Sequence, residues 1–262
     1  MIDILVQVVS EVAQYQRRAF TDADIVFQTK TNQFDLVSEV DKRSQQMLLA
    51  AIERYFPASG IVAEEDGQDK PSRNGTWFLV DPLDGTANFK AGIPLWAISI
   101  GFVRDGVVNS GIISLPSTGE IFCSQDSLPI IQPLEKLAAA QFYGIDSTFE
   151  NSPLTGLMLR RRQLGAAVPT LLWCCESRNR QRPRLDFALM GKGSFWDVCG
   201  AIAFLKQKGG ALIDVTGQDF TECTDVFQAL GGVKGIRTYN FRYVASASKK
   251  VAQEVYQHYL RG

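Results

Sequence analysis

Hydrophobic residues near the start of the chain recur at helical spacing. The first apolar stripe predicts an amphipathic helix, and it consists of Ile2, Leu5, Val6, Val9, Val12 and Ala13. A second helix is expected from Asp41 to Pro57, with an apolar face made of Met47, Leu48, Ala51, Ile52, Tyr55 and Phe56. Two helices are therefore predicted before the first strand.

Short apolar runs then replace the helical pattern. Residues 60–63 and 77–80 predict buried strands, because each run is too short for a helix. Residues 96–103 and 107–113 are joined at Asp105-Gly106 and predict a β-hairpin, and residues 121–123 predict a third strand. This part of the chain is expected to form a sheet.

The second half mixes helical and strand patterns. Residues 124–137 have little pattern, so we expect one half at 1–135 and another at 136–262. Residues 141–145 form an apolar segment, and the run Arg160–Arg162 is expected on an exposed helical face. Helices are predicted at about 168–175, 198–205 and 248–260, and strands at 211–214 and 243–245.

Carboxylates follow two of the predicted strands. Residues 77–80 run into Asp81-Pro82-Leu83-Asp84-Gly85, where Pro82 fixes one φ angle and Gly85 allows a tight turn. Residues 60–63 run into Glu64-Glu65-Asp66. If the two strands are neighbours and end at the same edge, these acids share one crevice. Such a group needs a cation, and oxygen ligands favour Mg²⁺ over Ca²⁺ or Mn²⁺.

A simpler interpretation treats each acid separately. Asp84-Gly85 can be an ordinary turn with Asp81 at a solvated strand end. Asp41 and Asp197 stand near predicted helix starts, where an aspartate commonly caps the helix or faces its dipole. The metal hypothesis requires all of these carboxylates to converge.

Composition narrows the classes of function. The net charge is −1, from 27 basic and 28 acidic residues, so no basic field favours nucleic acid. No apolar run is long enough to span a bilayer and no signal peptide is indicated, so a cytoplasmic location is expected.

Five cysteines without Cys-x-x-Cys spacing suggest reduced, buried thiols. The only histidine, His258, lies in the C-terminal helical pattern, which disfavours a His-based triad or a zinc site.

Together these segments resemble the inositol monophosphatase family of Mg²⁺-dependent, lithium-sensitive phosphatases. The resemblance rests on the motif of residues 81–89, Asp-Pro-Leu-Asp-Gly-Thr-Ala-Asn-Phe, and on Ala63-Glu64-Glu65. It extends to Asp35-Leu36-Val37 with Asp41, and to the Trp196–Ala201 segment followed by Gly209-Gly210. It implies an α/β fold, a layered α-β-α-β-α sandwich like that of fructose-1,6-bisphosphatase, and a homodimer.

The resemblance also implies roles for individual residues. Two or three Mg²⁺ ions per active site are expected, held by Glu64, Asp81, the Leu83 carbonyl, Asp84 and Asp197. Asp41 and Thr86 would hold the attacking water, and Glu64 would support a third ion. Lys30 matches a mobile-loop lysine. The positions that would contact phosphate or substrate are Gly85, Thr86, Lys30, Gly165, Ala166 and Met190.

The residues expected to contact the substrate depart from the family pattern. Met190 stands where inositol-specific members carry an acid, and alanines stand after Gly165 where those members often have threonine. Inositol monophosphate is the default substrate, and histidinol phosphate, fructose 1,6-bisphosphate and 3′-phosphoadenosine 5′-phosphate are alternatives. A haloacid-dehalogenase-type phosphatase shares an Asp-Gly-Thr sequence but has a different acid spacing. A non-catalytic regulator that keeps the fold is the alternative of another class.

Overall fold

The computed structural model of the protein describes residues 2–21, 27–29, 36–65, 69–126, 134–149, 154, 157–175 and 184–261. Lys30, Asp35 and Asp66 lie outside the described residues, so their expected roles stay predictions. Within the described residues, no helix is both long enough and apolar enough to cross a membrane.

Both predicted N-terminal helices are present. Helix α1 spans Ile2–Phe20 and α2 spans Glu39–Tyr55. Helix α2 begins before Asp41 because Ser38 is its N-cap and Asp41 is the third helical residue, and each side chain bonds the other's backbone N–H. Strands β1 (Phe27–Thr29) and β2 (Leu36–Ser38) pair as a small antiparallel sheet.

The first large sheet has the order β3-β4-β5-β6-β7. Its strands are Gly60–Ala63, Thr76–Asp84, Ala97–Arg104, Val107–Leu115 and Glu120–Cys123. Strands β3 and β4 are parallel neighbours with Ala63 opposite Val80, which confirms that the two acidic segments leave the same edge. The prediction that the strand ends at residue 80 is wrong. Strand β4 continues through an irregularity to Asp84, because Asp84 still pairs with Ala97.

The second large sheet has the order β11-β12-β10-β8-β9. In chain order its strands are Phe142–Ile145, Arg160–Arg162, Phe187–Met190, Ala211–Asp214 and Tyr243–Ser246. The helical interpretation of Arg160–Arg162 is wrong. These residues form the edge strand β9, because their backbone pairs in parallel with β8, while their side chains stay exposed.

Further helices complete the fold. Helix α3 spans Thr86–Lys90, α4 spans Ala167–Cys175 and α5 spans Phe195–Gln207. Helix α8 spans Lys249–Val255 and continues as a π-helical segment at Tyr256–Leu260, where a single α-helix was expected. A short 3₁₀ turn lies at Leu137–Ala139. Helices α6 (Val226–Leu230) and α7 (Gly232–Thr238) were not predicted, since α6 has only five residues and the two glycines of α7 make its sequence resemble a loop.

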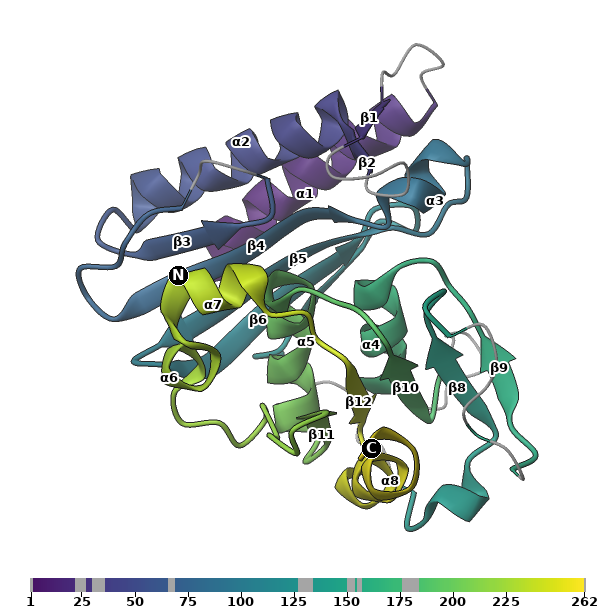
Figure 1. Cartoon of the computed structure of the whole chain (residues 1–262). Coiled ribbons are helices and arrows are strands. Elements are labelled where there is room, and N and C mark those ends of the chain that lie inside the picture. The colour runs from purple at the N-terminus through teal and green to yellow at the C-terminus, as the bar shows by residue number, and fades with distance from the viewer. Residues whose placement is uncertain are drawn as a thin grey trace.

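The elements stack in five layers (Figure 1). Helices α1 and α2 lie on one face of the first sheet, α4 and α5 lie between the two sheets, and α8 covers the outer face of the second sheet. Strand β3 shows the alternation that separates the layers: Val62 faces the central core, while Ile61 and Ala63 face α1 and α2. The layered α-β-α-β-α sandwich is therefore confirmed.

Helix α5 packs unusually closely on the first sheet. A Cβ atom on Gly111 would lie 2.3 Å from the carbonyl oxygen of Gly200, and one on Gly200 would lie 2.6 Å from Ser99 Oγ. Likewise, a Cβ atom on Gly101 would lie 2.3 Å from Cys199 Sγ. We call these three glycines the glycine seam. The seam brings the N-terminal turn of α5, which carries Asp197, close to the edge of the sheet.

All five cysteines are buried and free. Burial raises the pKa of the Cys199 thiol above its ordinary range, so this group stays protonated. His258 is exposed in the C-terminal segment. The expectation of reduced, buried thiols is confirmed, and these groups contribute packing to the fold.

Candidate metal and phosphate site

A buried glutamine holds the acidic turn from behind. Gln16 on α1 donates to the Pro82 carbonyl at 2.8 Å and to Ser44 Oγ at 2.9 Å, and it accepts a bond from Trp96 Nε1 at 3.0 Å. Its side chain is fully buried. The irregular end of β4 is thus fixed to both helices of the outer layer.

Asp81 is the electrostatic centre of the site. Its side chain is 2% exposed, and burial raises the pKa of its carboxyl well above the usual range. The charges of Glu64, Asp197 and Asp84 raise this pKa further, and Glu64 also shares a side-chain hydrogen bond with it. Four of the predicted ligands therefore lie close enough to interact electrostatically, and they come from the residue after β3, from β4 and from the first turn of α5.

Asp41 and Thr86 meet beside this group. Thr86 Oγ1 donates to Asp41 Oδ1 at 2.8 Å and lies 3.2 Å from the Leu83 carbonyl oxygen. Asp41 is buried, and its pKa is raised by desolvation and by the nearby charge of Glu64, although bonds from Ser38 and Thr86 oppose the shift. The pair predicted to hold water is therefore hydrogen-bonded and adjacent to the acidic group.

Asp84 connects the first sheet to helix α4. Its Oδ1 and Oδ2 atoms accept bonds from the backbone N–H groups of Ala167 and Val168 at 3.1 and 2.8 Å. Burial nevertheless raises the pKa of Asp84 to about 7, against those two bonds. The contact also places Ala166 beside Gly85, since a Cβ atom on Gly85 would lie 3.0 Å from that of Ala166. Gly85 adopts a φ of 95°, which favours glycine at this turn.

Asp197 serves its helix as well as the site. It is the third residue of α5, where its Oδ2 accepts a bond from the Ser194 N–H at 2.8 Å. Asp41 has the same role on α2. Both aspartates therefore lie at helix starts as expected, but the N-caps are Ser38 and Ser194, and each aspartate is the third helical residue of a capping box. This role coexists with the position of Asp197 near Asp81 and of Asp41 near Glu64.

The residues present fit a hard divalent cation by their donor chemistry. Several carboxylates lie around a buried one, and the main charges acting on Asp81 are all negative. In the described part of the chain, however, no three such side chains already converge as a finished cage. Hydrogen bonds to backbone amides hold oxygens of Asp84 and Asp197. The site is best described as an acidic cluster that can receive positive charge.

Two more of the expected substrate positions, Gly165 and Met190, are described by the structure. Gly165 precedes α4, and a Cβ atom there would lie 2.5 Å from Asn88 Oδ1, so it packs against the turn of residues 85–88. Met190 is 4% exposed and packs in the central core, directly opposite Tyr243 on β12. Its contact with substrate stays a prediction.

Three residues that the sequence did not single out surround the cluster. Gln16 supports the acidic turn, and Arg237 donates to the carbonyl that precedes Glu64. Tyr243 is fully buried in the field of Asp197 and Asp84, and within the described residues its hydroxyl has no hydrogen-bond partner. A polar residue in the apolar stripe of α1 was a signal for Gln16, whereas nothing in the local sequence marks Arg237 or Tyr243.

Comparison with known proteins agrees with this architecture. The model of the inositol monophosphatase family matches residues 1–138. A fructose-1,6-bisphosphatase/inositol-1-monophosphatase of Thermotoga maritima is 27% identical over 202 residues, covering 72% of this chain and 75% of that protein. The Nus factor SuhB of Xylella fastidiosa is 24% identical over 239 residues, covering 86% and 85%. The structure of extragenic suppressor protein suhB from Bartonella henselae aligns with a TM-score of 0.79 at 18% identity, over 100% of this chain and 98% of that one.

The fold and the acidic cluster define a layered α/β protein of the class that includes inositol monophosphatase and fructose-1,6-bisphosphatase. More specifically, the chain belongs to the inositol monophosphatase family. Members of this family are phosphatases that use Mg²⁺.

Proposed function

We propose that this protein is a Mg²⁺-dependent phosphomonoesterase that hydrolyses a small phosphorylated metabolite by direct attack of water. The observation that carries the proposal is the gathering of Glu64, Asp84 and Asp197 around buried Asp81. The hydrogen-bonded pair of Asp41 and Thr86 beside that group supports the same conclusion.

In this proposal the metal-binding groups are the side chains of Glu64, Asp81, Asp84 and Asp197 and the Leu83 carbonyl. Asp81 suits a bridging role because the other carboxylates act on it from separate elements. Two or three bound Mg²⁺ ions would supply the positive charge that offsets the phosphate, acidifies water and stabilises the departing oxygen. These assignments follow from the donor set and from family membership.

Thr86 and Asp41 would prepare the nucleophile. Because the Thr86 hydroxyl donates its hydrogen to Asp41 Oδ1, its lone pairs are available to accept a bond from water. The water oxygen then forms a bond to phosphorus while its proton moves toward Thr86, and Thr86 passes its own proton to Asp41. The ester P–O bond breaks, and the departing alkoxide takes up a proton from solvent. No covalent enzyme intermediate is required.

The phosphate would lie at the turn that begins α3. Backbone N–H groups of Gly85 and Thr86 are proposed as donors to its oxygens, with Lys30 as a further contact. Gly165, Ala166 and Met190 are proposed for the side of the site that receives the rest of the substrate. The amides of Ala167 and Val168 are already used by Asp84, so they are not proposed as phosphate donors.

Inositol monophosphate is the default substrate. Histidinol phosphate, fructose 1,6-bisphosphate and 3′-phosphoadenosine 5′-phosphate remain the alternatives, because Met190 cannot accept a strong hydrogen bond from a sugar-like hydroxyl. A homodimer, a cytoplasmic location, lithium sensitivity and the division into halves at 1–135 and 136–262 are further proposals drawn from the family.

The test is phosphate release from a panel of these monoesters with Mg²⁺ present. We expect turnover by the wild type, and a loss of at least about 100-fold in the Asp84→Asn variant, since metal catalysis contributes several kcal/mol. Failure of the wild type to release phosphate from any ester, or unchanged turnover in Asp84→Asn, would overturn the proposal. A trapped phospho-aspartate would instead favour the haloacid-dehalogenase mechanism.

A second function is suggested by the comparisons. The similarity to a protein named Nus factor SuhB raises a regulatory role that depends on binding another protein. The Asp84→Asn variant separates the two functions in cells: a regulator would keep its cellular role without turnover, whereas an enzyme would lose that role.

A further inference from the structure

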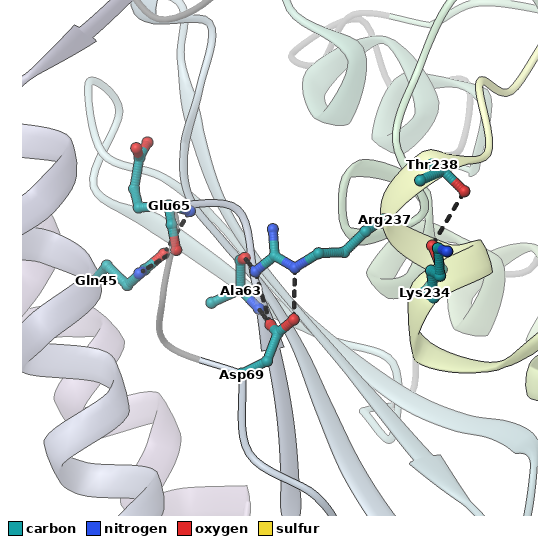
Figure 2. Close-up of polar contacts among 7 residues, drawn as sticks. All are labelled: Gln45, Ala63, Glu65, Asp69, Lys234, Arg237 and Thr238. Atoms are coloured by element: carbon teal, nitrogen blue, oxygen red, sulfur yellow. Dashed lines mark hydrogen bonds and ion pairs between the residues drawn. The ribbon is translucent and has the colours of Figure 1, made fainter.

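The backbone on both sides of Glu64 is held in place by side chains from distant elements (Figure 2). On one side, Gln45 of α2 donates to the Glu65 carbonyl at 3.0 Å and accepts from the Glu65 N–H at 2.9 Å. The Glu64 N–H itself donates to the Val80 carbonyl at 3.0 Å. On the other side of Glu64, the Ala63 carbonyl is held by a contact that comes from the second half of the chain.

Arg237 makes that contact from the last turn of α7. Its Nη2 atom donates to the Ala63 carbonyl at 2.6 Å and to Asp69 Oδ1 at 2.7 Å, and its Nε atom donates to Asp69 Oδ2. Figure 2 shows the guanidinium reaching from the helix to the end of β3. Asp69 also accepts from the Ala63 N–H at 3.4 Å, so the three residues form one connected network.

The same guanidinium lies over the ring of Trp196, with Cζ 5.5 Å from the ring centroid. Trp196 is the residue before Asp197, just as Ala63 is the residue before Glu64. One side chain therefore contacts the neighbours of two carboxylates that act on Asp81. Those carboxylates come from separate layers, Glu64 from the end of the first sheet and Asp197 from α5.

We propose that Arg237 is a positioning residue that sets the separation of Glu64 and Asp197 for metal binding. This inference rests on the proposed function. Arg237 acts through Ala63 and Trp196, so it supports the site without belonging to the catalytic group. Residues that hydrogen-bond metal ligands directly typically contribute 10- to 100-fold in metal affinity, and Arg237 acts one residue away from each of the two ligands.

The contacts require arginine rather than any positive charge. A planar guanidinium can donate to a carboxylate and a carbonyl while its face lies on an aromatic ring. A lysine ammonium can pair with Asp69, but it has no planar face to stack on Trp196. The side chain of Arg237 is 23% exposed and that of Asp69 is 29% exposed, and two parallel hydrogen bonds join them, so lysine cannot reproduce this bidentate pair.

The experiment compares Arg237→Ala and Arg237→Lys with the wild type and with Lys234→Ala. Lys234 lies one turn earlier on α7 and is exposed, so its replacement removes the same charge while leaving the network intact. Two quantities are measured for each protein: the Mg²⁺ concentration that gives half-maximal phosphate release, and the rise in melting temperature as Mg²⁺ is added.

For Arg237→Ala we expect the half-maximal Mg²⁺ concentration to rise at least about tenfold, with most of the turnover recovered at saturating Mg²⁺. The melting-temperature titration should shift to higher Mg²⁺ by the same factor. Arg237→Lys should fall between Arg237→Ala and the wild type, and Lys234→Ala should match the wild type.

Unchanged Mg²⁺ dependence in Arg237→Ala would overturn the inference. This holds even if the variant melts at a lower temperature, because Arg237 would then stabilise the fold without affecting metal binding. An equal shift of the half-maximal Mg²⁺ concentration in Lys234→Ala would also overturn the inference, because the loss of any positive charge would then explain the effect. A wild type that neither binds Mg²⁺ nor releases phosphate would remove the proposed function and this inference together.

Discussion

The hydroxyl of Thr86 donates a hydrogen bond of 2.8 Å to the carboxylate of Asp41, which is 45 positions earlier in the chain. This bond joins the turn after β4 to the first turn of α2. It places a proton donor and acceptor next to the acidic cluster, at the position proposed for activation of a water molecule.

Removing this hydroxyl should reduce turnover without unfolding the protein. We expect Thr86→Ala to lower kcat by about 100-fold, because general-base assistance contributes on the order of 10²- to 10⁴-fold. Thr86→Ser keeps the hydroxyl and should retain most of the activity. The measurement is kcat at saturating Mg²⁺ with the melting temperature as a control. Equal activity in the alanine and serine variants would exclude a role for the hydroxyl.

Asp84→Asn should abolish the stabilisation that Mg²⁺ gives the protein. In the wild type, a ligand that binds only the folded state raises the melting temperature as its concentration increases. An asparagine lacks the negative charge and keeps only one side-chain oxygen. The backbone N–H groups of Ala167 and Val168 compete with the metal ion for that oxygen. Thermal unfolding with and without Mg²⁺ tests this expectation. A full Mg²⁺ response in the variant would show that Asp84 is not a ligand.

Without divalent cations, the protein should become less stable as the pH rises from about 4 to about 7. The pKa of Asp84 is about 7 in the folded protein, whereas an unfolded aspartate has a pKa of about 3.9. The folded state therefore binds this proton more tightly, so its contribution is complete below pH 4 and is lost as the pH passes 7. The same sign holds for Asp81.

Melting temperatures across this pH range in a chelator give the measurement. Asp84→Asn is the matched control, because it cannot ionise and should show a smaller decline. Mg²⁺ should restore stability most at the upper end of the range. A wild type whose decline with pH is no steeper than that of Asp84→Asn would contradict the prediction.

Buried Tyr243 and partly buried Tyr239 should respond oppositely to loss of the hydroxyl. Tyr243→Phe removes a hydroxyl that has no partner among the described residues, so the free energy of unfolding should stay equal or rise by about 1 kcal/mol. Tyr239→Phe removes a bond to Asp214 Oδ2 and should cost about 1 kcal/mol. Denaturant unfolding measures both, and a clear loss in Tyr243→Phe would reveal a partner for that hydroxyl.

Gln16→Leu should destabilise the fold by about 3 kcal/mol, because it leaves the Trp96 N–H and the Pro82 carbonyl buried without partners. Gln7→Leu is the control, since Gln7 lies on the exposed face of the same helix. Denaturant unfolding measures the difference. Similar stability in the two variants would show that Gln16 does not fix the acidic turn.

Local patterns predicted much of this fold. The stripes of α1 and α2 and the apolar runs of the first sheet predict the elements found there, because burial on one face dictates their periodicity. The register of β3 beside β4 then explains why the acids after residues 63 and 80 share an edge. The remaining residues of the site were predicted from the resemblance to the inositol monophosphatase family, and not from local patterns.

Long-range pairing was harder to predict. Arg160–Arg162 carries three exposed charges, and only its neighbour β8 makes it a strand. Arg237 follows Gly231, Gly232 and Gly235, so its helix has little intrinsic propensity, and its importance arises from contacts 168 and 174 positions away. Such residues can be found only when the tertiary structure shows what they touch.

At the glycine seam, the main chain of α5 contacts the first sheet directly. This contact determines how far Asp197 lies from the other carboxylates of the acidic cluster. Gly200 lies three residues after Asp197, and the carbonyl of Gly200 occupies the space that a methyl group on Gly111 would need. A single added carbon atom there would force the helix outward and carry Asp197 away from Asp81. Damage to catalysis can therefore begin in a part of the interior that no substrate, ion or solvent molecule reaches.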